Sequence, residues 1–189
     1  FKSIRPKLLE SYGKVENTYK DDKSVVTELD IWAEQQIKTA LHTFDASIGF
    51  LGEEHGAEGD ETLRWVIDPI DGTEQFIRGV PICTNMATLA DGKDLLVSVI
   101  YNFVTDELYW AVKGGGAWLG DRRLSISERP LDRSFVDLGF DLADEVALTM
   151  ARKLVPVVKA TTRYYASGYS TYMIASGRTE GRVVVAGKG

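Results

Sequence analysis

The sequence has few of the residues that cross-link small proteins or bind transition metals. It contains 1 cysteine, Cys83, and 2 histidines among 189 residues. A single cysteine cannot build a disulfide framework or a cysteine-based zinc site within one chain. No apolar run approaches the roughly 20 residues that a membrane-spanning helix needs. These absences favour a cytoplasmic protein with no membrane partner, whose chemistry depends on other residue types.

Positive charge is also in the minority. The chain has 28 Asp and Glu against 22 Lys and Arg, which gives a formal net charge of −6. Because an acidic surface repels a phosphate backbone, we expect no nucleic acid polymer as a partner. A small phosphorylated metabolite stays compatible with this charge, since a bound divalent cation reverses the local sign.

Helix and strand patterns alternate along the chain. Apolar residues between positions 28 and 44 recur every three or four residues and predict a helix over 28–43. Other predicted helices cover the segment up to residue 12, 142–155 and 170–175. Predicted strands and extended segments cover 48–51, 64–68, 83–89, 95–102, 107–112, 117–119, 134–139, 163–165 and 182–185. This mixture of helices and antiparallel hairpins predicts a layered α/β (α+β) sandwich.

A pair of acids at the end of a hydrophobic strand carries the strongest chemical signal. Asp68 and Asp71 are three residues apart, and on a strand they would point to opposite faces. We expect Pro69 to end the strand, because it cannot donate to a central ladder. On the resulting turn the two carboxylates can converge, with the Ile70 carbonyl free beside them. Oxygen ligands of this kind are those that Mg²⁺ prefers.

The next two residues suit a phosphate. Gly72 permits close approach of the backbone, and the amides of Gly72 and Thr73 can point at a phosphate oxygen, helped by a helix N-terminus if one begins there. A simpler interpretation is an acidic turn with a helix cap. Taken alone, an Asp-x-x-Asp-Gly segment is more often such a turn.

Two further acidic segments are ambiguous by themselves. Gly52–Glu54 follows a predicted buried strand, where a carboxylate can share a metal site with a neighbouring strand end; a solvated loop is the commoner case. Thr27 and Asp30 form the pattern of a capping box, which explains them as a helix N-terminus. An Asp in a first helical turn can also face a site, so both interpretations of Asp30 stay open.

Three segments nevertheless occur in the order and approximate spacing of the inositol monophosphatase family. They are Thr27–Asp30, Leu51–Glu54 and Trp65–Thr73, which reads Trp-Val-Ile-Asp-Pro-Ile-Asp-Gly-Thr. The third motif is highly specific, and the chain resembles the family over nearly its whole length. Weaker similarities to family turns and strands lie at Pro81, Tyr101, Glu107–Tyr109, Gly114–Ala117, Ala166–Gly168 and Ala175–Arg178.

This resemblance implies a sugar-phosphatase-like fold and Mg²⁺-dependent hydrolysis of a small phosphate monoester such as myo-inositol monophosphate, in a homodimer. Two or three Mg²⁺ ions per site would neutralise the phosphate and lower the pKa of the attacking water. The matching residues would serve as metal ligands (Glu53, Asp68, Asp71 and the Ile70 carbonyl), as catalytic groups (Asp30, Glu53 and Thr73), as phosphate-binding groups (Gly72 and Thr73) and as substrate-binding groups (Asp71, Gly168 and Ser170).

The chain departs from the family pattern at two places. Glu74–Gln75 stands where many members have Thr-Asn, which could tune substrate choice or face solvent. The closing Trp-Asp motif, whose Asp completes a metal site, is absent before the sequence ends at Gly189. We therefore expect a fold truncated at its C-terminus and a weakly held second Mg²⁺. Residues 1–189 would form one phosphatase domain or its first two-thirds, divided into a metal- and phosphate-binding part (1–130) and the start of a substrate-side part (131–189).

The exact substrate stays open at this stage. An acidic residue that inositol-specific members place in the last strand has no counterpart in Val183–Val185, which weakens the case for inositol. Histidinol phosphate, a nucleotide 3′-phosphate and fructose bisphosphate are alternatives for the same fold. A catalytically silent scaffold is the alternative from another class, although the retained acids argue against it.

Overall fold

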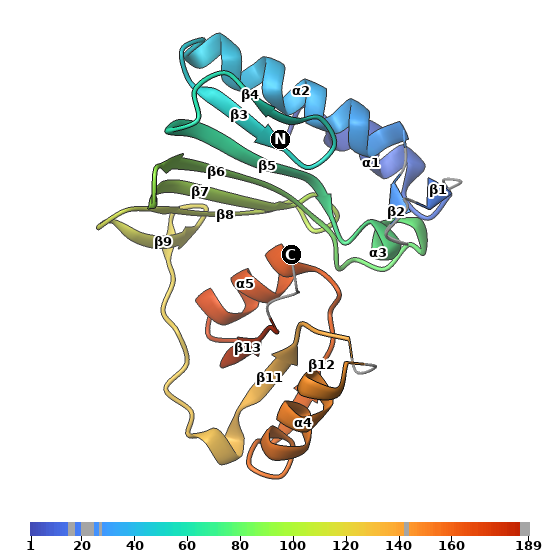
Figure 1. The fold of residues 1–189 in the computed structure, drawn as a ribbon, viewed down its shortest axis with the longest axis vertical. Helices are drawn as coiled ribbons and strands as arrows, with labels where there is room; N and C mark the ends of the chain where they lie inside the picture. The colour runs from blue at the N-terminus through green and yellow to red at the C-terminus, as the bar shows by residue number, and fades with distance from the viewer. Residues whose placement is uncertain (15–17, 20–24, 27, 142–143, 186–189) are drawn as a thin grey trace. The chain divides into compact units, whose positions relative to one another are not determined.

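Figure 1 shows a computed structural model of the chain, which describes residues 1–14, 18–19, 25–26, 28–141 and 144–185. The contacts divide the chain into two compact units, Phe1–Arg123 and Leu124–Gly189. The division of roles at residue 130 that the sequence suggests stays a prediction.

The first unit is built on an eight-stranded sheet with the order β10-β9-β8-β7-β6-β5-β3-β4. Strands β3 and β5 run parallel, and the other neighbours are antiparallel. The strands are β3 (Gly49–Gly52), β4 (Gly56–Glu58), β5 (Leu63–Asp71), β6 (Thr84–Asp91), β7 (Asp94–Asn102), β8 (Glu107–Val112), β9 (Gly116–Leu119) and β10 (Arg122–Arg123). A separate two-stranded sheet pairs β1 (Thr18–Tyr19) with β2 (Val25–Val26).

Helix α2 (Glu28–Phe44) lies along one face of the large sheet with α1 (Arg5–Ser11) beside it (Figure 1). Its buried apolar residues, Leu29, Ala33 and Ile37, join the core under the sheet. The recurrence of apolar residues every three or four positions predicted a helix over 28–43, and the structure confirms this helix. Apolar residues from helices, strands and the turns between them complete the core: Ile4, Leu8, Ile48, Phe50, Trp65, Ile67, Ile70, Phe76, Cys83, Ala87, Tyr101 and Phe103.

The prediction that the strand ends at Asp68 is wrong. Strand β5 continues through Pro69 to Asp71. Its register against β6 shifts between Asp68 and Asp71, which is a bulge. Proline is tolerated at a bulge, because the ladder is interrupted there and no donor is required. The short helix α3 (Thr73–Ile77) begins directly afterwards.

The second unit has a three-stranded parallel sheet with the order β12-β11-β13. Its elements are β11 (Phe135–Leu138), β12 (Ala160–Thr162), β13 (Gly181–Val183), α4 (Glu145–Leu154), α5 (Ser167–Ala175) and the short 3₁₀ turn Leu131–Arg133. The extended segment predicted at 163–165 lies after the strand, and Tyr165 has a left-handed φ of 56°. Of the predicted helix over 142–155, residues 142–143 lie outside the described residues.

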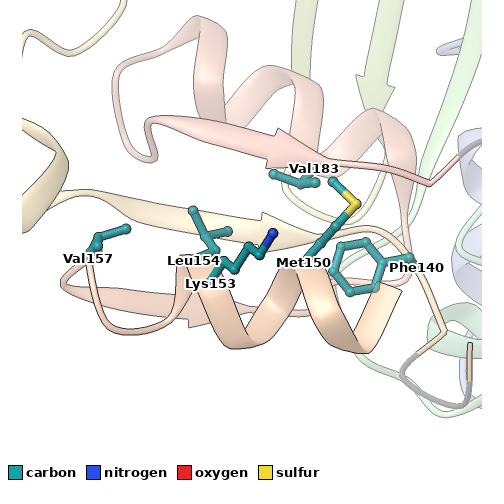
Figure 2. Close-up of a pocket in the computed structure, with 6 residues that line it drawn as sticks. All are labelled: Phe140, Met150, Lys153, Leu154, Val157 and Val183. Atoms are coloured by element: carbon teal, nitrogen blue, oxygen red, sulfur yellow. The ribbon is translucent and has the colours of Figure 1, made fainter. Parts of the chain in front are cut away.

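A pocket of about 270 Å³ lies beside α4 in this unit (Figure 2). Its lining consists of Phe140, Met150, Lys153, Leu154, Val157 and Val183. None of these described lining residues is an acid, so they offer no carboxylate to a cation. In the described part of the chain, no helix has the length and apolar character needed to cross a membrane.

Candidate active site

The bulge in β5 determines where the two acids of the long motif point. Asp68 pairs with Met86 and Asp71 with Thr84, so three steps along β5 match two along β6. In a regular strand the two carboxylates would lie on opposite faces. The extra residue removes that alternation, so the bulge allows the Asp68 and Asp71 carboxylates to converge, which we had expected from a turn.

Two polar residues of β6 hold the bulge. The Asn85 side-chain amide donates to the Pro69 carbonyl at 2.6 Å, and the Thr84 hydroxyl donates to Asp71 Oδ2 at 3.1 Å. Both side chains are fully buried. Neither residue was predicted from the sequence. The available signal was a pair of polar residues at the start of an otherwise apolar strand.

Replacing Asn85 with leucine is expected to lower the free energy of unfolding by about 1–3 kcal/mol, because the buried Pro69 carbonyl loses its donor. Urea denaturation without added metal measures this change. Ser98→Ala is the control, since it removes a side-chain hydrogen bond to Thr88 that is only part-buried. An Asn85→Leu variant that loses no more stability than Ser98→Ala would show that this contact does not hold the bulge.

The acids around the bulge interact strongly. Burial, followed by the negative charges of Asp71, Glu53 and Asp30, raises the pKa of Asp68 to about 9. The Asp68 atom Oδ1 is buried and has no hydrogen-bond partner among the described residues. A buried oxygen facing other carboxylates is costly unless a cation or a proton offsets the charge.

These residues fit a divalent cation chemically. Hard carboxylate oxygens are the ligands of Mg²⁺, and Asp68 offers one that no protein group occupies. Within the described residues, no three His, Cys, Asp or Glu side chains already converge as a metal-binding group. The Glu53 side chain is exposed, whereas Asp71 is buried. The cluster therefore supplies charge and donors, and the ligand set named from the family stays a prediction.

Asp30 in α2 lies close to Thr73, the first residue of α3. The Thr73 hydroxyl lies 3.2 Å from Asp30 Oδ1 and 3.0 Å from the Ile70 carbonyl, so it can donate to either oxygen. Asp30 is 2% exposed in the first turn of α2. Thr27, the other half of the predicted capping box, lies outside the described residues. The contact with Thr73 shows that Asp30 faces the β5–α3 junction.

The Gly72–Thr73 junction has the geometry of a tight turn. Gly72 has φ 82° and ψ 44°, a left-handed conformation that glycine adopts without strain, and its carbonyl accepts from Phe76 N at 2.9 Å. The Ile70 carbonyl was expected to be free. It lies within hydrogen-bonding distance of the Thr73 hydroxyl, and a carbonyl oxygen retains a second lone pair for another partner.

Two of the three substrate-binding residues named from the family, Gly168 and Ser170, lie in the second unit. Gly168 and Ser170 are both buried in α5. The Ser170 hydroxyl has no hydrogen-bond partner among the described residues. Their contact with a substrate stays a prediction, whereas Asp30, Glu53, Asp68, Asp71 and Thr73 all belong to the first unit.

A layered α/β fold with an acidic cluster beside a Gly-Thr turn is an arrangement suited to phosphatases. Comparison with a known structure supports this fold. The chain superimposes on the extragenic suppressor protein SuhB of Bartonella henselae with a TM-score of 0.90 and 28% identity, covering 96% of this chain and 73% of that one. The predicted layered α/β fold is confirmed.

Sequence comparisons identify the family. Residues 3–185 match the model of the inositol monophosphatase family. The chain is 33% identical over 183 residues to inositol-1-monophosphatase of Caulobacter vibrioides, covering 90% of this chain and 72% of that protein. It is 36% identical over 125 residues to fructose-1,6-bisphosphatase/inositol-1-monophosphatase of Aquifex aeolicus, covering 64% of this chain and 47% of that protein.

The chain belongs to the inositol monophosphatase family, as its motifs predict, and it is thereby assigned to the phosphatases. Its alignments span between 47% and 72% of the length of these two relatives.

Proposed function

We propose that the protein hydrolyses a small phosphate monoester, such as myo-inositol monophosphate, with the help of Mg²⁺. The observation that carries this proposal is the buried, unpartnered oxygen of Asp68 beside Asp71 and Glu53. A cluster of this kind gains stability from a divalent cation, and Mg²⁺ dependence is typical of the family.

Each part of the first-unit site has a distinct role in this reaction. Glu53, Asp68, Asp71 and the Ile70 carbonyl would hold the cations. When bound, two or three Mg²⁺ ions would neutralise the phosphate and make a water acidic enough to attack phosphorus at neutral pH. The amides of Gly72 and Thr73 would orient the phosphate, and positioning supplies most of the catalysis in phosphoryl transfer.

Asp30 and Thr73 would manage the proton of the attacking water. The Thr73 hydroxyl donates to the Asp30 carboxylate, so it can pass its own proton to Asp30 as its oxygen takes one from the attacking water. Glu53, whose side chain is exposed, is a second candidate acceptor. These assignments follow the family motif residue by residue.

One departure from the family has a structural explanation. Glu74 lies in α3 and pairs with Arg78 at 2.9 Å, with side chains that are 40% and 70% exposed. An exposed pair of this kind contributes little to stability. We therefore assign Glu74 to the solvent-facing side of α3 and not to substrate selection.

A panel of phosphate esters tests the proposed function. We expect phosphate release that requires Mg²⁺ and stops when a chelator is added. The panel contains myo-inositol monophosphate, histidinol phosphate, a nucleotide 3′-phosphate and fructose bisphosphate, because the same fold could take any of them. Folded protein that binds Mg²⁺ and releases no phosphate from any ester would favour the silent scaffold instead.

The cellular setting remains part of the proposal. We propose a cytoplasmic homodimer that acts on a small phosphorylated metabolite. The relatives named above support an enzyme of small substrates. Sedimentation of the purified protein would measure its oligomeric state directly.

A further inference from the structure

Glu34 is a buried acid that none of the proposed catalytic steps uses. It lies four residues after Asp30 in α2, and positions four apart share one face of a helix. The residue is 2% exposed. An acid this deeply buried needs several hydrogen bonds to offset the loss of water.

Within the described residues, the hydrogen bonds of Glu34 all go to one short turn. The Glu34 atom Oε2 accepts from the amide of Glu54 at 2.8 Å, and Oε1 accepts from the amide of His55 at 3.1 Å. The ring nitrogen Nδ1 of His55 lies 2.5 Å from Oε1. Both carboxylate oxygens therefore bind groups that immediately follow Glu53 in the chain.

The same turn is held from the opposite side by β5. The amide of Glu53 donates to the carbonyl of Ile67 at 3.2 Å. Ile67 directly precedes Asp68, so this bond ties Glu53 to the strand that carries the acidic bulge. Glu53 is thereby clamped between β5 and the first two turns of α2.

The fit between Glu34 and the turn is close. A Cβ atom added at Gly52 would lie 2.4 Å from the Glu34 carboxyl carbon, far inside van der Waals contact. Glycine at this position lets the backbone lie directly against the carboxylate. The contact involves Glu34 and the residue just before Glu53, so it too bears on where Glu53 is placed.

Only an acceptor with two equivalent oxygens can satisfy this arrangement. A glutamine has almost the same shape, but it would turn an NH₂ group toward one of the two backbone amides. Two donors would then face each other. Glu34→Gln therefore releases one anchor of the turn and leaves the packing volume unchanged.

We propose that Glu34 is a positioning residue that holds Glu53 at the cation site through the backbone of the Glu53–His55 turn. This inference rests on the proposed role of Glu53 as a ligand. Residues that orient metal ligands typically change metal affinity by 10–100-fold when they are replaced. Glu34 itself touches neither substrate nor cation in this proposal.

The test compares Mg²⁺ binding by titration calorimetry in the wild type and in Glu34→Gln. We expect Mg²⁺ affinity to fall by about 10–100-fold, with turnover at saturating Mg²⁺ reduced much less. The matched control is Glu58→Gln, which removes the same charge from β4. Glu58 pairs with Lys38, and the control should bind Mg²⁺ like the wild type.

A second variant approaches the contact from the other side. Gly52→Ala places a methyl group against the flexible end of Glu34, so the carboxylate is displaced while the backbone can stay. We expect it to weaken Mg²⁺ binding as Glu34→Gln does. If Glu34→Gln does not fold, Gly52→Ala still tests whether the contact between Glu34 and the turn positions Glu53 for Mg²⁺ binding.

Three results would overturn the inference. The first is unchanged Mg²⁺ affinity in Gly52→Ala. The second is a Glu34→Gln variant that loses stability while its Mg²⁺ affinity stays the same, which would leave a purely structural tie. The third is an equal loss of affinity in Glu58→Gln, which would indicate a general effect of charge.

Failure of the proposed function gives a different pattern. Protein that binds Mg²⁺, loses affinity in Glu34→Gln and releases no phosphate would retain the positioning role without catalysis. A wild-type protein that binds no Mg²⁺ would overturn both proposals.

Discussion

Replacing Asp68 with asparagine is expected to lower turnover by about 100-fold or more while the protein stays folded. The change removes the negative charge that Asp68 would carry as a cation ligand beside Asp71 and Glu53, and it keeps the side-chain shape. Charge stabilisation by bound cations supplies several kcal/mol of the barrier reduction in phosphate hydrolysis. A ligand set with one charge fewer holds the cations less tightly and offsets less of the phosphate charge.

The same substitution should not destabilise the metal-free protein. Asp68 Oδ1 has no hydrogen-bond partner to lose among the described residues. Because burial and the neighbouring acids raise the pKa of Asp68 to about 9, this group is already protonated and neutral at pH 7 without a cation, and a neutral asparagine changes no charge there. A variant that loses turnover but keeps its free energy of unfolding shows that the residue contributes to the reaction and not to the stability of the fold.

Thermal unfolding with and without Mg²⁺ separates these effects. A ligand at 100 times its dissociation constant stabilises a folded protein by about 2.7 kcal/mol. We expect this stabilisation in the wild type and a clearly smaller one in Asp68→Asn. Asp91→Asn, at the far end of β6, is the control and should behave like the wild type. Unchanged turnover in Asp68→Asn would remove Asp68 from the cation site.

The position of the acidic pair was readable from the sequence, but its geometry was not. An apolar strand followed by Asp68 and Asp71 indicates an acidic site at the end of that strand. The rule that proline ends a central strand then gave the wrong boundary, since a bulge accommodates Pro69 within β5. Whether a strand ends or bulges depends on its neighbour, and the Asn85 amide that caps the Pro69 carbonyl is 16 residues away.

The sequence-based prediction omitted or misplaced strands that form because they pair with a neighbour and not because of their intrinsic β propensity. Strand β4 is Gly-Ala-Glu, which has little intrinsic preference for extended structure, and it forms because it pairs with β3. In the second unit, residues 163–165 were expected to be an extended segment. Parallel pairing with β11 selects Ala160–Thr162 instead. Context outweighs β propensity in both cases.

Glu34 illustrates a limit of a different kind. The apolar period of α2 was recognised, yet an acid within it reads as part of a solvated face. Its partners are backbone amides 20 and 21 residues later in the chain. Backbone amides carry no sequence signal, so an acid that binds them is identified only from the fold.

The second large effect is expected for Asp30→Asn, which should lower turnover at saturating Mg²⁺ by about 100-fold. General acid–base groups contribute 10²–10⁴-fold to rates. The Thr73 hydroxyl can still donate to the oxygen of an asparagine, so the geometry at 3.2 Å can persist. Only the charge that makes the Thr73 oxygen a better proton acceptor is lost.

Asparagine also remains a capable N-terminal residue of a helix, so we expect the free energy of unfolding to change by less than about 1 kcal/mol. Glu28→Gln is the control, because Glu28 is an exposed acid in the same first turn of α2. It should retain wild-type turnover. Equal turnover in wild type and Asp30→Asn would leave Asp30 a purely structural role.

A double-variant cycle decides whether Asp30 acts through Thr73. Thr73→Val keeps the shape of the side chain and removes the hydroxyl. If the two residues form one proton-accepting unit, the double variant should be hardly slower than the slower single variant, since residues that act together are not additive. Independent roles would instead multiply the two losses. If the double variant folds and its loss of turnover is the product of the two single losses, Asp30 contributes charge to the cation site and Thr73 binds phosphate. The hydrogen bond between the two residues would then not make them one proton-accepting unit.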